Sequence, residues 1–294
     1  PGPRRTLNPD MRSFVPKAVK SLATIALAGS MLSGCISVPE QVQLTRNGKP
    51  AMTCETRGPM PAHSPVLDGG GFSVTTWNIY KGKLRGWDRD LETFHRQSDL
   101  LLLQEAHLVS EFRDWLELKS SDWAMAHAFA LSDAWSGVLT LGKVPQQSPC
   151  AQRIHEPYLR LPKTTLISYF PVAGHSEPLL VANVHGVNFT LGSSDLAAQL
   201  QAVQEVINAH KGPIILAGDF NTWSDARMQV VRRLAATHKL QSVAFQQQQP
   251  IGQFGHQLDH IYYRGLIPLH SQVTQVESSD HYPLSVTFSL DTEI

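Results

Sequence analysis

The sequence predicts an α/β protein in which packed β-sheets carry helices on their outer faces. Apolar, β-forming runs bounded by turn residues indicate buried strands, and these runs outnumber the helical segments. The helical segments fall between pairs of strands, which is typical of helices that cover the outside of sheets. A composition of 42% hydrophobic and 17% charged residues over 294 residues allows one large core.

Each element is placed from its own residue pattern. The expected strands are Ser73–Tyr80, Leu100–Glu105, Trp123–Ala130, Gly137–Gly142, Thr165–Phe170, Leu179–His185, Pro213–Asn221, His260–Tyr263, Ser271–Val276 and Leu284–Leu290. The expected helices are Val109–Ser120, Ser194–His210 and Asp225–Leu240. Ser193 or Ser194 can cap the second helix, whose apolar residues repeat with helical spacing.

Residues 36–71 are expected to form a tether ahead of the folded domain. The segment is rich in Pro, Gly and polar residues, shows no sustained periodicity and ends in three consecutive glycines. Such a composition is typical of a flexible linker. We therefore expect the folded domain to span residues 72–294.

The segment Met11–Cys35 is similar to a bacterial secretory signal. Basic residues come first, an apolar stretch follows, and small residues end the segment. The apolar stretch is shorter than a comfortable membrane span. Its last four residues, Leu-Ser-Gly-Cys, resemble a lipobox, which implies lipidation at Cys35 and, because Ile36 rather than Asp follows, sorting to the outer membrane. The alternative is a buried or frayed N-terminal helix.

Removal of residues 1–34, the signal and the residues upstream of it, would leave a periplasm-facing chain with a small negative charge. The segment holds five of the 25 basic residues and one of the 25 acidic residues, so 20 basic and 24 acidic residues remain, a net charge of −4. A basic stripe, usual in proteins that grip duplex DNA non-specifically, is missing. The oxidising periplasm permits a disulfide between Cys54 and Cys150, with two unpaired thiols as the alternative. We expect a monomer.

Five apolar runs end on polar residues that suit metal or phosphate chemistry. These residues are Asn78, Glu105, His185, Asp219 and the pair Asp280–His281. Charged groups are rarely buried unless they are paired or bind a metal, so these endings are poor choices for stability alone. We therefore expect them to assemble into one site at the edge of a sheet.

Glu105, Asn78 and Asp280 are candidate metal ligands. Mg²⁺ prefers oxygen ligands and is often bound by one or two carboxylates. Glu105 would be held rigidly by its strand, and Asn78 can support the ion or its water without adding charge. Taken singly, Asn and Glu at strand ends are usually turn or surface residues.

Asp219 and Asn221 form a second candidate pair. In an extended chain they project to the same side, and the preceding Gly218 allows close backbone approach. One could orient the nucleophile or protonate the leaving group, and the other could hydrogen-bond a phosphate oxygen. The alternative is an ordinary Asx turn that leads into the next helix.

Three further residues suit proton transfer and charge stabilisation. His281 is a candidate general base at neutral pH, and Asp259 could hold it in the right tautomer and stabilise its cation. His185 could donate a hydrogen bond to a phosphoryl transition state. A lone His is more often structural, and the chain contains 13 of them.

In this order along the chain, the motifs resemble the endonuclease/exonuclease/phosphatase superfamily of DNase I-like enzymes over about residues 72–290. The matching motifs are Trp77-Asn78, Gln104-Glu105, Asn183-Val184-His185, Gly218-Asp219-Phe220-Asn221, Leu258-Asp259 and Ser279-Asp280-His281. A closer similarity to the YafD-like branch, whose substrate is poorly defined, rests on Trp77-Asn78-Ile79-Tyr80-Lys81, Ser136-Gly137-Val138, His185-Gly186-Val187-Asn188-Phe189 and Tyr262-Tyr263-Arg264-Gly265-Leu266.

The resemblance implies a four-layer α/β/β/α sandwich and metal-dependent phosphoester hydrolysis with Mg²⁺, or with Mn²⁺ or Ca²⁺. It implies that the ion is surrounded by Asn78, Glu105 and Asp280. It also implies that His281 is a base oriented by Asp259, and that the phosphate is contacted by His185, Asp219 and Asn221.

The chain departs from the family pattern at two places. His260 follows the Leu-Asp pair, where the family often has an aromatic residue. The acidic residue that steadies the phosphate-contacting His in DNase I has no clear counterpart, and Glu156 is a candidate in a loop that differs.

The substrate stays open between nucleic acid and phosphodiesters of lipid head groups or small molecules. The net charge of −4 favours the second class. A lipid anchor would keep the site near a membrane, which suits head groups and also suits scavenging of nucleotides. The alternative function is a non-catalytic lipoprotein scaffold; it should have lost Glu105, Asp219 or His281, and all three are present.

Overall fold

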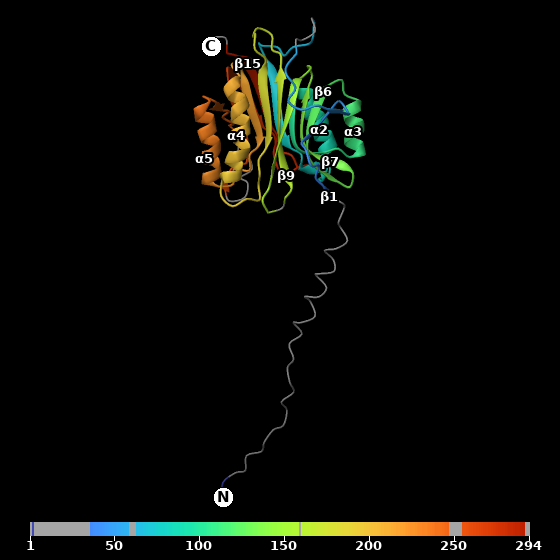
Figure 1. The fold of residues 1–294 in the computed structure, drawn as a ribbon, viewed down its shortest axis with the longest axis vertical. Coiled ribbons are helices and arrows are strands. Elements are labelled where there is room, and N and C mark those ends of the chain that lie inside the picture. Colours follow the sequence, from blue (N-terminus) through green and yellow to red (C-terminus); the bar gives the residue numbers. More distant parts are fainter. Residues whose placement is uncertain (1, 3–35, 59–62, 159, 247–254, 292–294) are drawn as a thin grey trace. The chain divides into compact units, whose positions relative to one another are not determined.

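Two β-sheets pack face to face in the computed structural model, and helices cover the outer face of each sheet (Figure 1). The structure describes residues 2, 36–58, 63–158, 160–246 and 255–291. Cys35 and the segment Met11–Cys35, expected to be a lipidated signal, lie outside the described residues. Among the helices of the described ranges, none has the length and apolar character needed to cross a membrane.

The larger sheet has nine strands and the smaller sheet has six. In spatial order the larger sheet contains β14 (Leu266–Val273), β15 (Leu284–Leu290), β4 (Phe72–Asn78), β5 (Leu100–His107), β7 (Ala134–Gly142), β6 (Asp122–Leu131), β2 (Gln43–Arg46) and β3 (Lys49–Ala51), and β6 also pairs with β1 (Ile36–Ser37). The smaller sheet contains β12 (Gln241–Ser242), β13 (Asp259–Arg264), β11 (Ile214–Asp219), β10 (Leu179–His185), β9 (Pro162–Phe170) and β8 (Gln147–His155).

Helices form the two outer layers of the fold. The larger sheet is covered by α2 (Trp87–Gln97) and α3 (Ser110–Glu117), and the smaller sheet by α4 (Ser194–Ala209) and α5 (Asp225–Thr237). A short 3₁₀ helix, η1 (Tyr80–Gly82), follows β4. The predicted four-layer α/β/β/α architecture is thereby confirmed.

Apolar residues fill all three interfaces between the layers. Between the sheets, Val74 and Leu102 of the larger sheet share one core with Val181 and Ile215 of the smaller sheet. Outside the smaller sheet, the core residues include Leu180, Leu216, Leu200 and Val231. Outside the larger sheet, they include Leu101, Leu103, Leu91 and Phe112. The central strands are buried on both faces, which explains why they read as nearly continuous apolar runs.

Residues 36–71 contribute strands to the larger sheet, so the expectation of a tether before Phe72 was wrong. β2 pairs antiparallel with β6, and Leu44 of β2 is buried. Leu67 is also buried, and its N–H donates to Pro171 O. A disulfide joins Cys54 to Cys150 of β8 across 96 residues. Leu44 and Leu67 lie too far apart in the sequence to form a periodic apolar pattern, and a disulfide leaves no such pattern either. The composition of the segment was therefore the only signal, and it indicated a linker.

Among the further elements that were not predicted are α2 and β8, and one predicted strand was displaced. In α2 only Leu91 and Phe94 are buried, and charged residues surround them in the sequence. β8 contains Pro149 and several polar residues, which weaken its strand signal. The strand predicted as Ser271–Val276 is β14, five residues earlier at its start, with an irregularity after Pro268 that obscures the pattern.

The direction of the strands decides where the site lies. β4 and β5 are parallel, as are β10 and β11, so the carboxyl ends of each pair meet at one edge. β15 runs antiparallel to β4 with Leu284 opposite Thr76, which places the start of β15 at that same edge. β13 runs antiparallel to β11 and begins there with Asp259. Residues that end or precede these strands therefore converge.

Candidate active site

Strand register places the site residues of the smaller sheet next to one another. His185 is the partner of Asp219 in the parallel pair β10–β11, and Asp219 is the partner of Asp259 in the antiparallel pair β11–β13. Asn78, from β4 of the larger sheet, donates from Nδ2 to Asp219 Oδ2 at 3.1 Å. This hydrogen bond joins the two sheets at the point where both contribute polar residues.

His281 and Asp259 form a hydrogen-bonded pair. His281 Nδ1 lies 2.7 Å from Asp259 Oδ2, and His281 Nε2 lies 3.8 Å from Asp219 Oδ2. Burial alone would lower the pKa of His281, but the charges of Asp259 and Asp219 outweigh it and raise that pKa well above its usual value. Burial raises the pKa of Asp219. The three groups together therefore hold a proton near neutral pH, and its transfer is the chemistry that they can provide.

Asp219 also makes the Asx turn that was the alternative interpretation. Its Oδ1 accepts from the N–H of Asn221 at 2.9 Å, while its Oδ2 faces Asn78 and the two histidines. Gly218 makes this arrangement possible. Its φ is +138°, and an added Cβ would lie 2.0 Å from Val184 O. One carboxylate thus serves the turn and the site at once.

Asn221 is turned toward the backbone of a neighbouring loop. Its Nδ2 donates to Gly186 O at 2.9 Å and lies 3.4 Å from Asp219 Oδ2. The residue is buried and has a positive φ of +51°, a conformation that Asn tolerates better than most residues. In this structure Asn221 ties the turn after β11 to the loop after β10.

Glu105 projects from an irregularity in β5. The pairing of β5 with β7 shifts register between Leu103 and Ala106, and Glu105 has a φ of +51°. Strained backbone of this kind is concentrated at functional sites. The carboxylate is paired with the Lys81 ammonium, and its Oε1 lies 3.8 Å from His185 Nε2. Burial would raise the pKa of Glu105, but the charges of Lys81 and Lys163 lower it overall.

Asp280 stays apart from this network. The residue is exposed, and its Oδ1 lies 3.5 Å from Ser279 Oγ. Ser279 has a stronger role, because its Oγ donates to Asn78 O at 2.6 Å and accepts from the N–H of His281 at 3.1 Å. The hydroxyl therefore fixes the position of His281 relative to β4.

His185 contacts a lysine that the sequence did not reveal as a site residue. Lys163, near the start of β9, places its Nζ 2.9 Å from His185 Nε2. Glu156, the candidate for the acid that steadies this His, instead accepts from the N–H of Asn188 at 2.7 Å and of Phe189 at 3.4 Å. Glu156 thus holds the loop that follows β10.

Arg227 of α5 supports the loops behind the site. The residue is fully buried and donates from Nε to Asn221 O at 2.6 Å, from Nη1 to Thr190 Oγ1 at 3.0 Å, and from Nη2 to Val187 O. His260 packs its ring against Phe220 and hydrogen-bonds Thr222. His260 therefore fills the place of the aromatic residue that was expected there. Neither role shows in the sequence, because both depend on partners in separate segments.

The donors at this edge fit a divalent cation. The Glu105 carboxylate and the Asn78 amide oxygen are hard oxygen ligands of the kind that Mg²⁺ prefers. Asn78 Oδ1 already accepts from the N–H of Tyr80 at 3.1 Å and retains a second lone pair. A second set, Asp219, Asp259 and His281, offers ligand atoms within 4.8 Å of one another.

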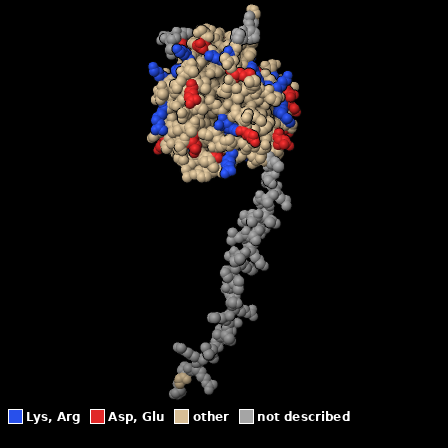
Figure 2. All heavy atoms as spheres, in the orientation of Figure 1, with Lys and Arg blue, Asp and Glu red and all other residues tan. Residues whose placement is uncertain are grey.

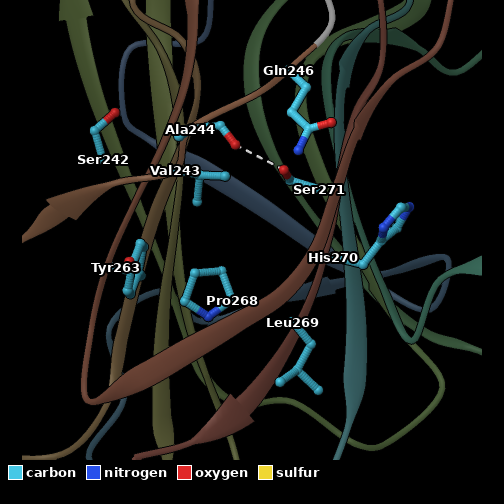
Figure 3. Close-up of a pocket in the computed structure, with 9 residues that line it drawn as sticks. All are labelled: Ser242, Val243, Ala244, Gln246, Tyr263, Pro268, Leu269, His270 and Ser271. Carbon is cyan, nitrogen blue, oxygen red and sulfur yellow. Dashed lines mark hydrogen bonds between the residues drawn. The ribbon is translucent and has the colours of Figure 1, made fainter.

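A cavity elsewhere in the fold lacks such groups. It has a volume of about 330 Å³ and lies between β12–β13 and β14, with Tyr263, Pro268 and His270 in its wall (Figure 3). Ser271 Oγ donates to Ala244 O across it. Its lining contains no carboxylate and no residue of the site described above. This cavity therefore offers none of the carboxylates found at the edge formed by the strand ends.

The sequence matches the model of the endonuclease/exonuclease/phosphatase family over residues 75–281. The chain belongs to this family. Its members are typically hydrolases of phosphoester bonds that use a divalent metal ion. The match begins in β4 and ends at His281, so it contains all the residues assembled at the edge of the sheets.

Relatives within the family carry names that state no activity. A UPF0294 protein of Vibrio campbellii is 36% identical over 279 residues, covering 91% of this chain and 98% of the relative. A UPF0294 protein of Klebsiella pneumoniae is 37% identical over 232 residues, covering 78% of this chain and 86% of the relative.

Solved structures share the fold at low identity. An endonuclease/exonuclease/phosphatase from Beutenbergia cavernae has a TM-score of 0.61 at 17% identity, covering 75% of this chain and 72% of its own. The human Nocturnin catalytic domain, with bound sulfate, has a TM-score of 0.59 at 20% identity, covering 77% and 97%. ANGEL2, a 2′,3′-cyclic phosphatase, has a TM-score of 0.57 at 17% identity, covering 75% and 96%. These likenesses establish a DNase I-like fold.

Proposed function

We propose that this chain is a metal-dependent phosphoester hydrolase that acts at the edge formed by β4, β5, β10, β11 and β13. The observation that carries the proposal is the hydrogen-bonded pair His281–Asp259, which faces the buried carboxylate of Asp219. Such a group of residues can take a proton from an attacking water and deliver one to a leaving oxygen. Family membership supports the reaction class.

The roles follow from the positions of the side chains. His281 acts as base toward water, and Asp259 stabilises the imidazolium that results. Asp219 lies beside it, accepts the proton that His281 holds at rest, and then delivers that proton to the leaving oxygen. Asn78 and Glu105 hold Mg²⁺, or Mn²⁺ or Ca²⁺, with exposed Asp280 available at the same edge. When bound, the cation would polarise a phosphoryl oxygen and favour loss of the proton held on His281.

We favour phosphodiesters of lipid head groups or small molecules over nucleic acid. The expected mature chain has a net charge of −4. On the face drawn in Figure 2, basic and acidic residues are scattered, without a continuous basic stripe. Two fold neighbours have been studied with phosphate-like anions, sulfate in Nocturnin and adenosine-2′,3′-vanadate in ANGEL2, which is compatible with a phosphate site here.

A substrate screen with and without EDTA tests this proposal. It includes plasmid DNA, RNA, phosphocholine lipids, phosphomonoesters and a generic phosphodiester. We expect EDTA-sensitive hydrolysis that H281A and D219A each abolish while thermal unfolding shows that the variants are folded. Unchanged turnover in both variants would contradict the assignment, and inactivity together with no heat on metal titration would support a non-catalytic scaffold.

The cellular location is a separate proposal. We infer that Cys35 is lipidated and that the mature monomer is anchored to the outer membrane and faces the periplasm. The lipobox-like ending of Met11–Cys35 and the Cys54–Cys150 disulfide support it. C35A should move the protein from the membrane fraction to the soluble periplasmic fraction, and light scattering of that form should give the mass of one chain.

We also propose that the chain belongs to the YafD-like branch, on the basis of the Trp77–Lys81 motif.

A further inference from the structure

The N-terminal strand of the domain starts at the edge that carries the site. β1 pairs with the last residues of β6, and Ile36 lies opposite Leu131. β6 turns there into β7, and the first part of β7 pairs with the end of β5 at His107. Because β5 brings Glu105 to this same edge, Ile36 and Glu105 lie at one edge of the sandwich.

Two neighbouring loops at this edge carry exposed apolar side chains. β9 runs antiparallel to β10, so the turn between β8 and β9 lies where β10 ends. Tyr158 in this turn is 61% exposed, and in the loop after β10 Phe189 is 56% and Leu191 78% exposed. Oε1 of Glu156, at the base of the turn, accepts from the N–H of Phe189 at 3.4 Å. This hydrogen bond holds the two loops side by side.

The N-terminal segment lies against the strand that leads into this turn. Arg153 of β8 donates from Nη1 to Pro39 O at 2.6 Å and from Nη2 to Glu40 O at 2.8 Å. Ile36, which is 54% exposed, comes three residues before Pro39, and Tyr158 comes five residues after Arg153. The exposed apolar side chains from three separate segments therefore lie in one part of the edge.

These side chains suit contact with a lipid surface. Single exposed apolar residues are common, but a group of them marks an interaction site. Tyr158 and Phe189 are the exposed aromatic side chains among the described residues, and the amphipathic ring of Tyr suits the boundary between lipid and water.

The position of Ile36 favours a membrane over a protein partner. Cys35, the expected lipidation site, directly precedes Ile36 in the sequence. The segment after it forms strands of the larger sheet rather than a long tether. An acyl chain on Cys35 would therefore hold this edge of the domain against the bilayer, with little freedom to turn away.

We propose that the edge of the sandwich that carries the site is a membrane-binding surface, and that Ile36, Tyr158, Phe189 and Leu191 enter the interfacial layer of a phospholipid bilayer. The surface would bring the site to phosphodiester bonds in lipid head groups. This choice of substrate rests on the proposed function, whereas the membrane contact itself does not.

Vesicle binding by the C35A protein tests the contact without an acyl chain. The probe is phosphatidylcholine vesicles, which carry no net charge, and the readout is cosedimentation. We expect Y158S and L191S each to weaken binding about tenfold, because each removes an apolar side chain that the bilayer buries in part. L118S is the matched control: Leu118 is 82% exposed and follows α3 at the opposite edge, where β6 begins, so binding should be unchanged. No binding by C35A, or equal binding by L191S and L118S, would overturn the proposal.

A fluorescent label reports which edge meets the bilayer. In the C35A protein, with Cys54 and Cys150 joined, an introduced L191C or L118C supplies one free thiol for an environment-sensitive dye. On addition of the same vesicles, the emission of the dye at position 191 should shift to the blue and be quenched by brominated lipid, and the dye at position 118 should not respond. Equal responses at both positions, or a response at neither, would overturn the proposal.

Hydrolysis assays separate this inference from the proposed function. L191S should keep the kcat/KM of the parent for soluble bis(p-nitrophenyl) phosphate and lose about tenfold on phosphatidylcholine in vesicles, in line with its weaker binding. An equal loss on both substrates would contradict a membrane role for Leu191. If no phosphoester is hydrolysed, the proposed function fails, while cosedimentation and the label still decide whether this edge binds a membrane.

Discussion

His281 Nδ1 lies 2.7 Å from Asp259 Oδ2, and the other nitrogen of the same ring faces Asp219 Oδ2 at 3.8 Å. One imidazole thus connects two carboxylates that are cross-strand partners in β11 and β13. Asp259 is the natural orienting partner because it accepts from Nδ1, which leaves Nε2 directed into the site. Nδ1 of His281 therefore fixes the orientation of the ring, and Nε2 is the nitrogen that can exchange a proton in the reaction.

Removing the charge of Asp259 should impair catalysis without unfolding the protein. D259N retains the size of the side chain but no longer stabilises the imidazolium, so we expect kcat to fall about 10²–10⁴-fold, the range for general acid–base groups. The measurement is phosphodiester hydrolysis at saturating Mg²⁺. D133N, an exposed substitution in the turn between β6 and β7, is the matched control and should be neutral. Equal activity of D259N and D133N would refute the role of the pair.

Lys81 should limit the affinity of the site for a divalent cation. Its ammonium is paired with the Glu105 carboxylate, the same group that we expect to bind the ion. K81M removes this competing charge, so Mg²⁺ should bind several-fold more tightly in isothermal titration. K83M, an exposed lysine two residues away, serves as the control. Weaker binding in K81M than in K83M would show that Lys81 assists the ion.

Removal of the metal should lower apparent stability as well as activity. An ion that binds only the folded chain stabilises it in proportion to the logarithm of its concentration over Kd, about 2.7 kcal/mol at 100 times Kd. We therefore expect EDTA to lower the thermal midpoint and added Mg²⁺ to restore it. E105Q should be insensitive to both treatments. An EDTA effect of equal size in E105Q would place the ion elsewhere, with Asp219, Asp259 and His281 as the next candidates.

Acid should destabilise the fold through a buried histidine of β6. Burial lowers the pKa of His127 to about 4; its Nε2 lies 2.9 Å from Thr45 Oγ1 and its ring stacks on Trp135. Because the folded pKa lies below the unfolded value of about 6.5, the unfolded chain binds more protons between these pH values, and stability falls as pH drops from 6.5 toward 4. The loss should approach about 3 kcal/mol.

Urea unfolding at several pH values measures this effect. In H127Q the pH dependence between 6.5 and 4 should be shallower by most of that amount, whereas H175Q, which changes an exposed His, should follow the wild type. Identical pH profiles for H127Q and wild type would show that His127 is not the group responsible. His260, whose pKa burial also lowers to about 4, would then be the next candidate.

The Cys54–Cys150 disulfide should hold the N-terminal strands on the larger sheet. It links the segment after β3 to β8 in the smaller sheet and closes a loop of 96 residues. Reduction should cost about 2–4 kcal/mol of unfolding free energy, because the unfolded chain gains entropy. The double variant C54S/C150S should lose the same amount of unfolding free energy, and reductant should not change its stability further. A wild-type urea midpoint that does not move on reduction would show that β2–β6 pairing alone secures the segment.

Much of the site could be predicted because its residues sit at strand ends. Asn78, Glu105, His185, Asp219 and the pair Asp280–His281 each follow or precede an apolar run, and buried polar endings are costly without a function. Five of these six residues lie in one connected network, and Asp280 is exposed beside it. The same signal was absent for β1–β3, where short, mostly exposed strands depend on a partner strand and a disulfide.

The sequence by itself determined the layers of the fold and the chemistry available at the sheet edge, because apolar periodicity and residue type are local properties. Only the tertiary structure decided the pairings: Asp259 with His281, Lys81 with Glu105, and Lys163 with His185. Each joins residues about 20 positions apart whose contact depends on strand register and on a bulge or turn between them. Lys163 shows the consequence, since an ordinary lysine near the start of β9 lies with its Nζ 2.9 Å from Nε2 of a site histidine, His185.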